Sequence, residues 1–167
     1  RPPGGPFPFL DRRKPHGLHI FAGANLEIIE SVAAQPHQKA EVIAMLRRVA
    51  RLHLEVESGF AQVRLTNLAG HKLPTGFPSR SVTLSCEAAT GGRTVRCGQH
   101  VYSATYKETS LLRVRAYATD NRLKPRESDV VRFQLPPGAE RVTVKAEYRG
   151  YPGGKPFEMA AAVWSSR

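Results

Sequence analysis

Apolar and polar residues alternate with a period of two through most of the chain after Gly59. In one stretch Val142 and Val144 alternate with Thr143 and Lys145, the pattern of an antiparallel strand with one buried face. The same alternation and similar apolar runs predict strands over residues 61–67, 82–86, 93–97, 111–118, 130–135, 141–148 and 157–164. About seven short strands separated by Pro- and Gly-rich turns are typical of an antiparallel, immunoglobulin-like β-sandwich.

A helical pattern precedes these strands. Apolar side chains over residues 36–56 recur at steps of three and four, which predicts an amphipathic helix. The positions on its predicted apolar face are Val42, Leu46, Val49, His53 and Val56. His53 is therefore expected to be a core histidine. Residues 25–34 favour helix as well.

The first residues of the chain form neither pattern. Residues 1–15 are rich in proline, glycine and basic side chains and predict an extended arm. We therefore expect three parts: an arm over 1–18, a helical segment over 19–58 and the sandwich over 59–167.

Composition and charge narrow the classes of partner. The 167 residues are 41% hydrophobic, enough for one sizeable core and short for two full domains. No apolar run approaches the roughly 18–20 residues that cross a bilayer, so we expect no membrane span. Lys and Arg total 25 against 14 Asp and Glu, a net charge of +11 that attracts anions. These basic residues are scattered without a recognition motif, so we expect no nucleic-acid partner.

The only two cysteines flank a predicted hairpin turn. Cys86 and Cys97 lie symmetrically about Gly91 and Gly92, a register that places the two thiols opposite one another. A disulfide there would indicate an oxidising compartment, periplasmic or extracellular. Two reduced core thiols are the alternative.

A constrained loop between two predicted strands is the strongest candidate for chemistry. Residues 67–80 contain two prolines and two glycines, which restrict the backbone path, and His71 lies near the loop's start. A rigid loop of this kind can present an imidazole as a ligand. A structured turn with a surface histidine is the alternative.

Three stretches resemble one family. Residues 70–80, Gly-His-Lys-Leu-Pro-Thr-Gly-Phe-Pro-Ser-Arg, resemble the "GHKLPTGYPSR" segment in the C-terminal β domain of bacterial multihaem c-type cytochromes. Residues 19–25, His-Ile-Phe-Ala-Gly-Ala-Asn, are similar to the "H-x-F-x-G-x-N" segment that follows the last haem motifs of such proteins. Residues 120–125, Asp-Asn-Arg-Leu-Lys-Pro, resemble their "DNRLxP" segment.

The resemblance implies a function beside haem. It makes His19 and His71 the candidate axial ligands of haem iron. Lys72, Arg80 and Arg122 become candidate partners of haem propionates, with plain solvation as the alternative. The implied role is a non-catalytic module of a multihaem cytochrome c electron-transfer assembly that caps haems and donates a distal histidine.

One departure from the family limits this role. The sequence contains no Cys-x-x-Cys-His site, so haem c is not attached covalently to these residues. The haem would belong to a partner chain or a missing domain, which implies a hetero-oligomer, or the module has lost its haem role.

Two other classes of function are compatible with the sequence. The main alternative is a haem-free, immunoglobulin-like binding or adhesion module, because a sandwich hosts many functions. A metallohydrolase could use His16 and His19 with a third ligand, and His16 could also replace His19 beside haem. His37 and His100 carry no signal beyond their residue type. No nucleophile lies in a Gly-x-Ser-x-Gly elbow and no phosphate-binding glycine loop is present, so we expect no catalytic residues.

Overall fold

The computed structural model describes residues 36–76, 79–108 and 115–166. The predicted arm, the predicted helix over 25–34 and the candidate ligands His16 and His19 lie outside these residues. In chain order the elements are α2 (Pro36–Arg48), β1 (Ala50–Glu57), β2 (Phe60–Asn67), β3 (Ser81–Thr90), β4 (Arg93–Glu108), β5 (Arg115–Asp120), β6 (Ser128–Gln134), β7 (Arg141–Arg149) and β8 (Phe157–Ser165).

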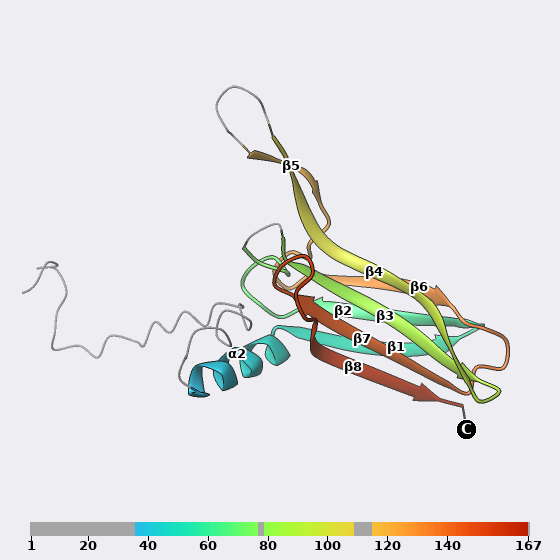
Figure 1. Cartoon of the computed structure of the whole chain (residues 1–167). Helices are drawn as coiled ribbons and strands as arrows, with labels where there is room; N and C mark the ends of the chain where they lie inside the picture. Colours follow the sequence, from blue (N-terminus) through green and yellow to red (C-terminus); the bar gives the residue numbers. More distant parts are fainter. Residues whose placement is uncertain (1–35, 77–78, 109–114, 167) are drawn as a thin grey trace, which may run out of the picture.

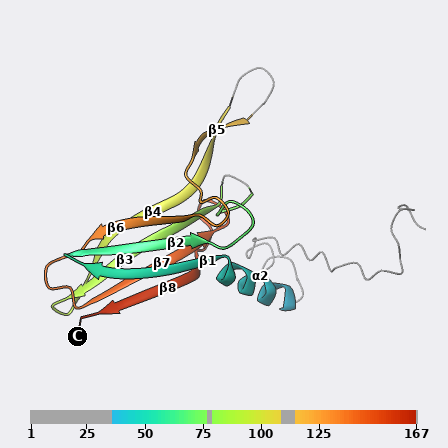
Figure 2. The same cartoon turned by 180° about the vertical axis from the view of Figure 1, so that it is seen from behind.

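The strands form two antiparallel sheets. One sheet has the order β1-β2-β6 and the other the order β5-β4-β3-β7-β8. Figures 1 and 2 show the two sheets layered against each other, with helix α2 at one end beside β1 and β8. The predicted mainly β, antiparallel sandwich preceded by a helix is confirmed.

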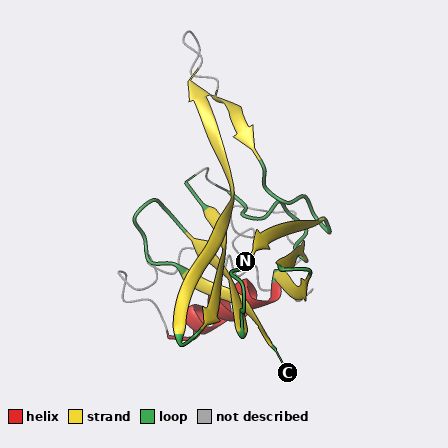
Figure 3. Ribbon diagram, turned by 90° about the vertical axis from the view of Figure 1, so that its right-hand side faces the viewer, coloured by secondary structure: helices red, strands yellow, loops and turns green. Residues whose placement is uncertain are grey.

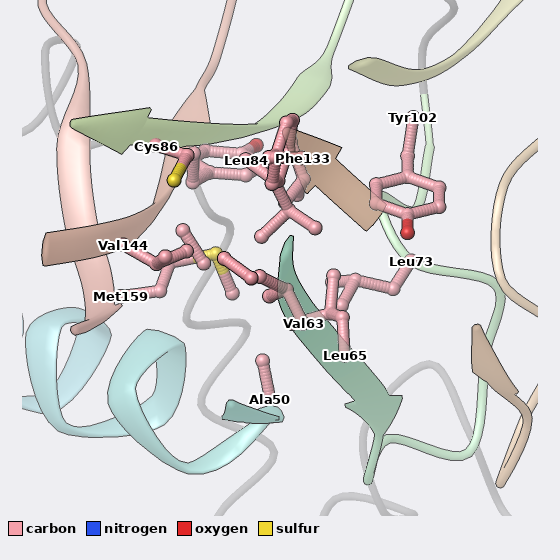
Figure 4. Packing of buried hydrophobic residues seen from close by; sticks show 14 of the residues in the cluster. Ala50, Val63, Leu65, Leu73, Leu84, Cys86, Tyr102, Phe133, Val144 and Met159 are labelled. Atoms are coloured by element: carbon pink, nitrogen blue, oxygen red, sulfur yellow. The ribbon is translucent and has the colours of Figure 1, made fainter. Parts of the chain in front are cut away.

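The core fills the space between the two sheets. Period-two alternation turns every second side chain inward, and the inward positions of β2, β3 and β7 are almost fully buried. Figure 4 shows Val63 and Leu65 from one sheet packed near Leu84 and Val144 from the other. The largest fully buried side chain is Tyr102, whose hydroxyl donates a hydrogen bond to Asp129 at 2.9 Å. This core makes the ends of the strands rigid supports for their loops.

The predicted helix over 36–56 is too long. Helix α2 ends at Arg48, and β1 pairs with β2 along its whole length from Ala50. The apolar residues of β1 also alternate, so the segment satisfies a strand pattern once β2 is available as a partner. Ser58 and Gly59, both with positive φ, close the tight hairpin between these strands. The sandwich therefore begins at Ala50, inside the segment predicted to be helical.

The placement of His53 in the core is wrong for the same reason. On strand β1 its side chain points to solvent and is 61% exposed, and its Nδ1 lies 3.8 Å from Glu55 Oε1. The neighbouring apolar positions Leu52 and Leu54 face the other way and are half-buried.

Strand β4 extends well beyond its neighbour β3. It pairs with β3 as far as Ser103 and with β5 from Ala104 onward. Figure 3 shows the resulting hairpin projecting from the sandwich. Tyr106 and Tyr117 stack across this hairpin with ring centroids 4.8 Å apart. Strand β5 then returns the chain to the sandwich at Asp120, where the next loop begins.

The two cysteines lie next to each other at a bulge in the β3–β4 hairpin. Cys86 pairs with Gly98 and Glu87 with Arg96, so Cys97 is the extra residue on β4. Both cysteines are thiols in the structure, and the disulfide stays a prediction. Burial, with a contribution from the adjacent Cys97, raises the pKa of the Cys86 thiol to about 12.

This difference in environment predicts the order in which the cysteines react. Because the thiolate is the reactive form, iodoacetamide at about pH 8.5 should modify the half-buried Cys97 of the reduced protein well before Cys86. Peptide mass spectrometry against time measures both rates, and the urea-unfolded chain is the control in which they should converge. Equal rates in the folded protein would contradict the burial of Cys86.

Candidate functional site

Residues 70–76 and 120–125, parts of two stretches that the sequence analysis singled out, meet at one end of the sandwich. The loop that follows β2 and the loop that follows β5 exchange a pair of backbone hydrogen bonds. Leu73 N donates to Leu123 O at 2.8 Å, and Leu123 N donates to Leu73 O at 3.1 Å. Both leucines are buried, 5% and 3% exposed, so the contact belongs to the core rather than the surface.

A buried amide holds the two loops together. Asn67, at the end of β2, is 0% exposed. The two hydrogens of its Nδ2 are shared among three backbone carbonyls, those of His71 at 2.6 Å, Leu123 at 3.1 Å and Lys124 at 3.0 Å. Its Oδ1 accepts from Ala69 N at 2.9 Å. Both ends of the amide are thus satisfied, as burial requires.

An ion cluster joins the same two loops beside this amide. Asp120 accepts from Arg122 Nε and Nη2, both at 2.8 Å, and from Lys72 Nζ at 2.7 Å. The side chains of Asp120 and Arg122 are only 14% and 7% exposed. The hydrogen bonds from Arg122, and then the one from Lys72, hold the pKa of Asp120 well below its usual range, against the opposing effect of burial.

The structure places His71, Lys72 and Arg80 on the loop that follows β2. The candidate Arg122 lies on the loop that follows β5, where its side chain is 7% exposed and pairs with Asp120. His71 is exposed, and its backbone carbonyl is fixed by Asn67. Lys72 directs its ammonium group to Asp120. Arg80 Nη1 donates to Thr75 O at 2.9 Å.

Glycine at position 76 makes room for this arginine. Gly76 has a φ of +86°, and a Cβ there would lie 2.6 Å from Arg80 Nη1. Thr75 and Gly76 therefore position the side chain of Arg80, the last residue of the loop: the first accepts its hydrogen bond and the second leaves space for it.

Sequence reasoning missed Asn67 and Asp120 as the groups that organise this end. A signal for Asn67 was present, because it occupies an inward position of β2 in line with Val63 and Leu65. A polar amide at a core position requires several hydrogen-bond partners. Asp120 begins the 120–125 segment, but its role could not be predicted, because its pairing with Lys72 spans 48 positions.

The described residues offer one exposed, backbone-anchored imidazole rather than a complete metal site. No three His, Cys, Asp or Glu side chains gather around a common point in the described part of the chain. His100 packs against Tyr102, ring edge to face, with centroids 4.7 Å apart. A lone imidazole such as that of His71 can complete the coordination of a metal that another chain or domain holds.

Across the described ranges, no helix is long and apolar enough to cross a membrane.

Comparison with known proteins identifies a shared fold. No protein-family model matches the sequence, and no curated protein matches it. Among solved structures, the chain is similar to a penta-heme cytochrome c552 from Thermochromatium tepidum, with a TM-score of 0.62 and 20% sequence identity. The match covers 74% of this chain and 41% of the cytochrome. The chain thus spans less than half the length of that protein.

The buried amide can be tested by an isosteric change. N67D keeps the side-chain size but places carboxylate oxygen against three carbonyl oxygens. We expect it to lower the free energy of unfolding by about 3–5 kcal/mol at neutral pH, the cost of an uncompensated buried charge. Urea denaturation followed by circular dichroism measures the change. Q134E adds the same charge at an exposed position of β6 and should be nearly neutral, whereas equal losses would contradict this role of Asn67.

The ion cluster predicts a specific dependence on pH. We expect D120N to cost about 2 kcal/mol at neutral pH, because it removes hydrogen bonds between charged groups. The folded-state pKa of Asp120 is depressed, so its contribution is complete above its ordinary pKa, about 3.9, and is lost as the pH falls toward the lower folded value. The difference in stability between wild type and D120N should therefore narrow below about pH 4.

A solvent-exposed ion pair provides the control for that experiment. E158Q removes the carboxylate that lies 3.3 Å from Lys145 Nζ, in a pair whose side chains are 49% and 44% exposed. We expect a loss below about 1 kcal/mol. Urea denaturation at several pH values compares both variants with wild type. A D120N deficit that persists unchanged at low pH would contradict the assignment.

Proposed function

We propose that this chain is a non-catalytic, haem-facing module of a multihaem cytochrome c electron-transfer assembly, periplasmic or extracellular. The observation that carries the proposal is the fold shared with a penta-heme cytochrome c552, in a chain that covers 41% of that protein. The contact between residues 67–76 and 120–127 supports it, because the two described segments with family resemblance build one rigid end of the sandwich.

The residues at this end fit a supporting role toward haem. His71 provides an exposed imidazole on a loop whose backbone is anchored by Asn67, so it can act as a distal axial ligand. The buried leucines and the satisfied amide beneath it provide a dry, rigid support. Haem c, held by a partner chain or another domain, would supply the one-electron chemistry. His19 stays a second candidate ligand.

The main role of Lys72 and Arg80 would be to stabilise the conformation of the loop that carries them. Lys72 is engaged with Asp120, and Arg80 with Thr75 O, so both help to set the loop's shape. Contact of either residue with a haem propionate stays a proposal. The partner would be a multihaem c-type cytochrome chain or domain in a hetero-oligomer.

The visible absorption spectrum of natively isolated material tests the proposal. Denaturing separation with haem staining and mass determination of every chain then locate the haem. A low-spin haem c spectrum with the stain on another polypeptide, or on a longer form of this chain, is the expected result. A colourless preparation without a haem-bearing partner would overturn the proposal and favour the haem-free binding module.

Substitution of His71 tests its role as a ligand. In the natively isolated assembly, H71A should convert one low-spin haem to high spin, because removal of an axial imidazole leaves the iron five-coordinate. Electron paramagnetic resonance and the visible spectrum detect the change. H53A removes another exposed histidine, from strand β1, and should leave the spectrum unchanged. Unchanged low-spin signals in H71A would exclude His71 as a ligand, and H19A would then test the other candidate.

A further inference from the structure

A polar trough crosses the outer face of the five-stranded sheet. Its volume is about 570 Å³. Strands β3, β4 and β7 form its floor. Its walls are Ser79 and Arg80 before β3, and Pro152, Gly153 and Pro156 between β7 and β8. The lining residues that carry charge or a hydroxyl group are Arg80, Arg96, Arg149, Glu147, Ser79, Ser81, Thr83, Ser85 and Ser103.

The trough arises from the difference in side-chain length between neighbouring strands. The outward positions of the central strand β3 hold the short side chains of Ser81, Thr83 and Ser85. The outward positions of β7 hold the long side chains of Glu147 and Arg149. Short residues between longer ones leave a channel along β3.

Strand register divides the trough into rows. Ser81 pairs with Ser103 on one side and with Arg149 on the other. The next outward residue of β3, Thr83, pairs with Glu147. Ser85 follows and pairs with Gln99, whose side-chain oxygen accepts a hydrogen bond from Arg96.

The charges therefore follow an order along the channel. Arg80 and Arg149 lie at one end, Glu147 near the middle and Arg96 toward the other end. Four residues of strand separate the first row from the third, a distance of about 14 Å. Arg96 lies opposite Glu87, beyond the third row, and its guanidinium reaches that row through its hydrogen bond to Gln99. Glu147 is the single acid among the residues that line the trough.

The segments with family resemblance fix one end of this trough. Arg80 comes from the loop that carries His71 and is held by Thr75 O. Asn121, from the other loop, donates to Val101 O at 2.7 Å and accepts from Ser103 N at 2.8 Å. These contacts fix the β4 side of the floor and Arg80 at this end of the trough.

We propose that the trough binds an extended, acidic peptide segment of a partner protein. In an extended peptide, residues one, three and five face the same side, and the first and fifth are about 14 Å apart. Acidic side chains at those two positions would meet Arg149 and Arg96, and guanidinium groups bind carboxylates in a bidentate manner. A hydroxyl at position three would donate to Glu147.

The order of charges along the trough also favours an acidic peptide over nucleic acid as the ligand. A nucleic-acid strand carries a negative charge on every nucleotide, so one phosphate would approach Glu147. A peptide can place a neutral donor there. The inference rests on the trough and does not depend on the proposed role beside haem.

Fluorescence anisotropy with a labelled peptide tests the proposal. The probe has the sequence Glu-Thr-Ser-Thr-Glu, and its matched control carries Gln at both ends. We expect saturable binding of the probe, weakened about tenfold by R149Q and by R96Q, since each removes a charge-assisted contact. R64Q removes the same charge from an exposed position on strand β2, which belongs to the other sheet. It should change the affinity for the probe by less than about twofold.

Four results would overturn the proposal: no saturable binding of the probe, equal binding of the Gln peptide, equal weakening by R64Q, or preference for a single-stranded oligonucleotide over the peptide. Circular dichroism of each variant checks that the sandwich is intact, as expected for exposed or half-buried positions. A colourless preparation that still binds the probe would reject the haem proposal and leave this one standing.

Discussion

The hydrogen bonds of one buried amide, that of Asn67, hold together the two loops at the end of the sandwich where His71 lies. Loops rarely have a rigid path unless their backbone groups are satisfied, and here a single side chain satisfies carbonyls from two loops more than 50 residues apart in sequence. The adjacent ion cluster at Asp120 and the paired leucines add to the same junction. Without the amide, the carbonyls of His71, Leu123 and Lys124 would lose the donor that they share.

The sequence predicted the sandwich well because period-two alternation is a local property of each strand. It failed where a strand also satisfies a helical pattern: the steps from Val49 to His53 and Val56 fit a helix until β2 provides hydrogen-bond partners. The site was only partly predictable. Residues 67–80 stood out by composition and resemblance, and residues 120–125 by resemblance. Their contact could not be predicted, because it depends on the tertiary structure. The trough could not be foreseen, since it depends on which strands of the five-stranded sheet are neighbours.

The buried core and the candidate binding surfaces occupy different parts of the architecture. The inward residues of both sheets form the core, whereas the loops at one end and the outward face beside them carry the exposed imidazole and the ordered charges. Arg80 belongs to both regions, because its loop carries His71 and its guanidinium lines the trough. In the proposed assembly, such a module would contribute position and surface, while the haem-bearing partner would carry out the redox chemistry.

Hydrogen exchange measured by mass spectrometry, on the isolated chain and on the natively isolated assembly, tests the central claim most directly. If this chain faces a haem-bearing partner through the loop end, amides within 67–76 and 120–127 should exchange more slowly in the assembly, while the β1–β2 hairpin turn at Ser58 and Gly59 should be unaffected. Protection of that hairpin turn with none at the loops would contradict the account.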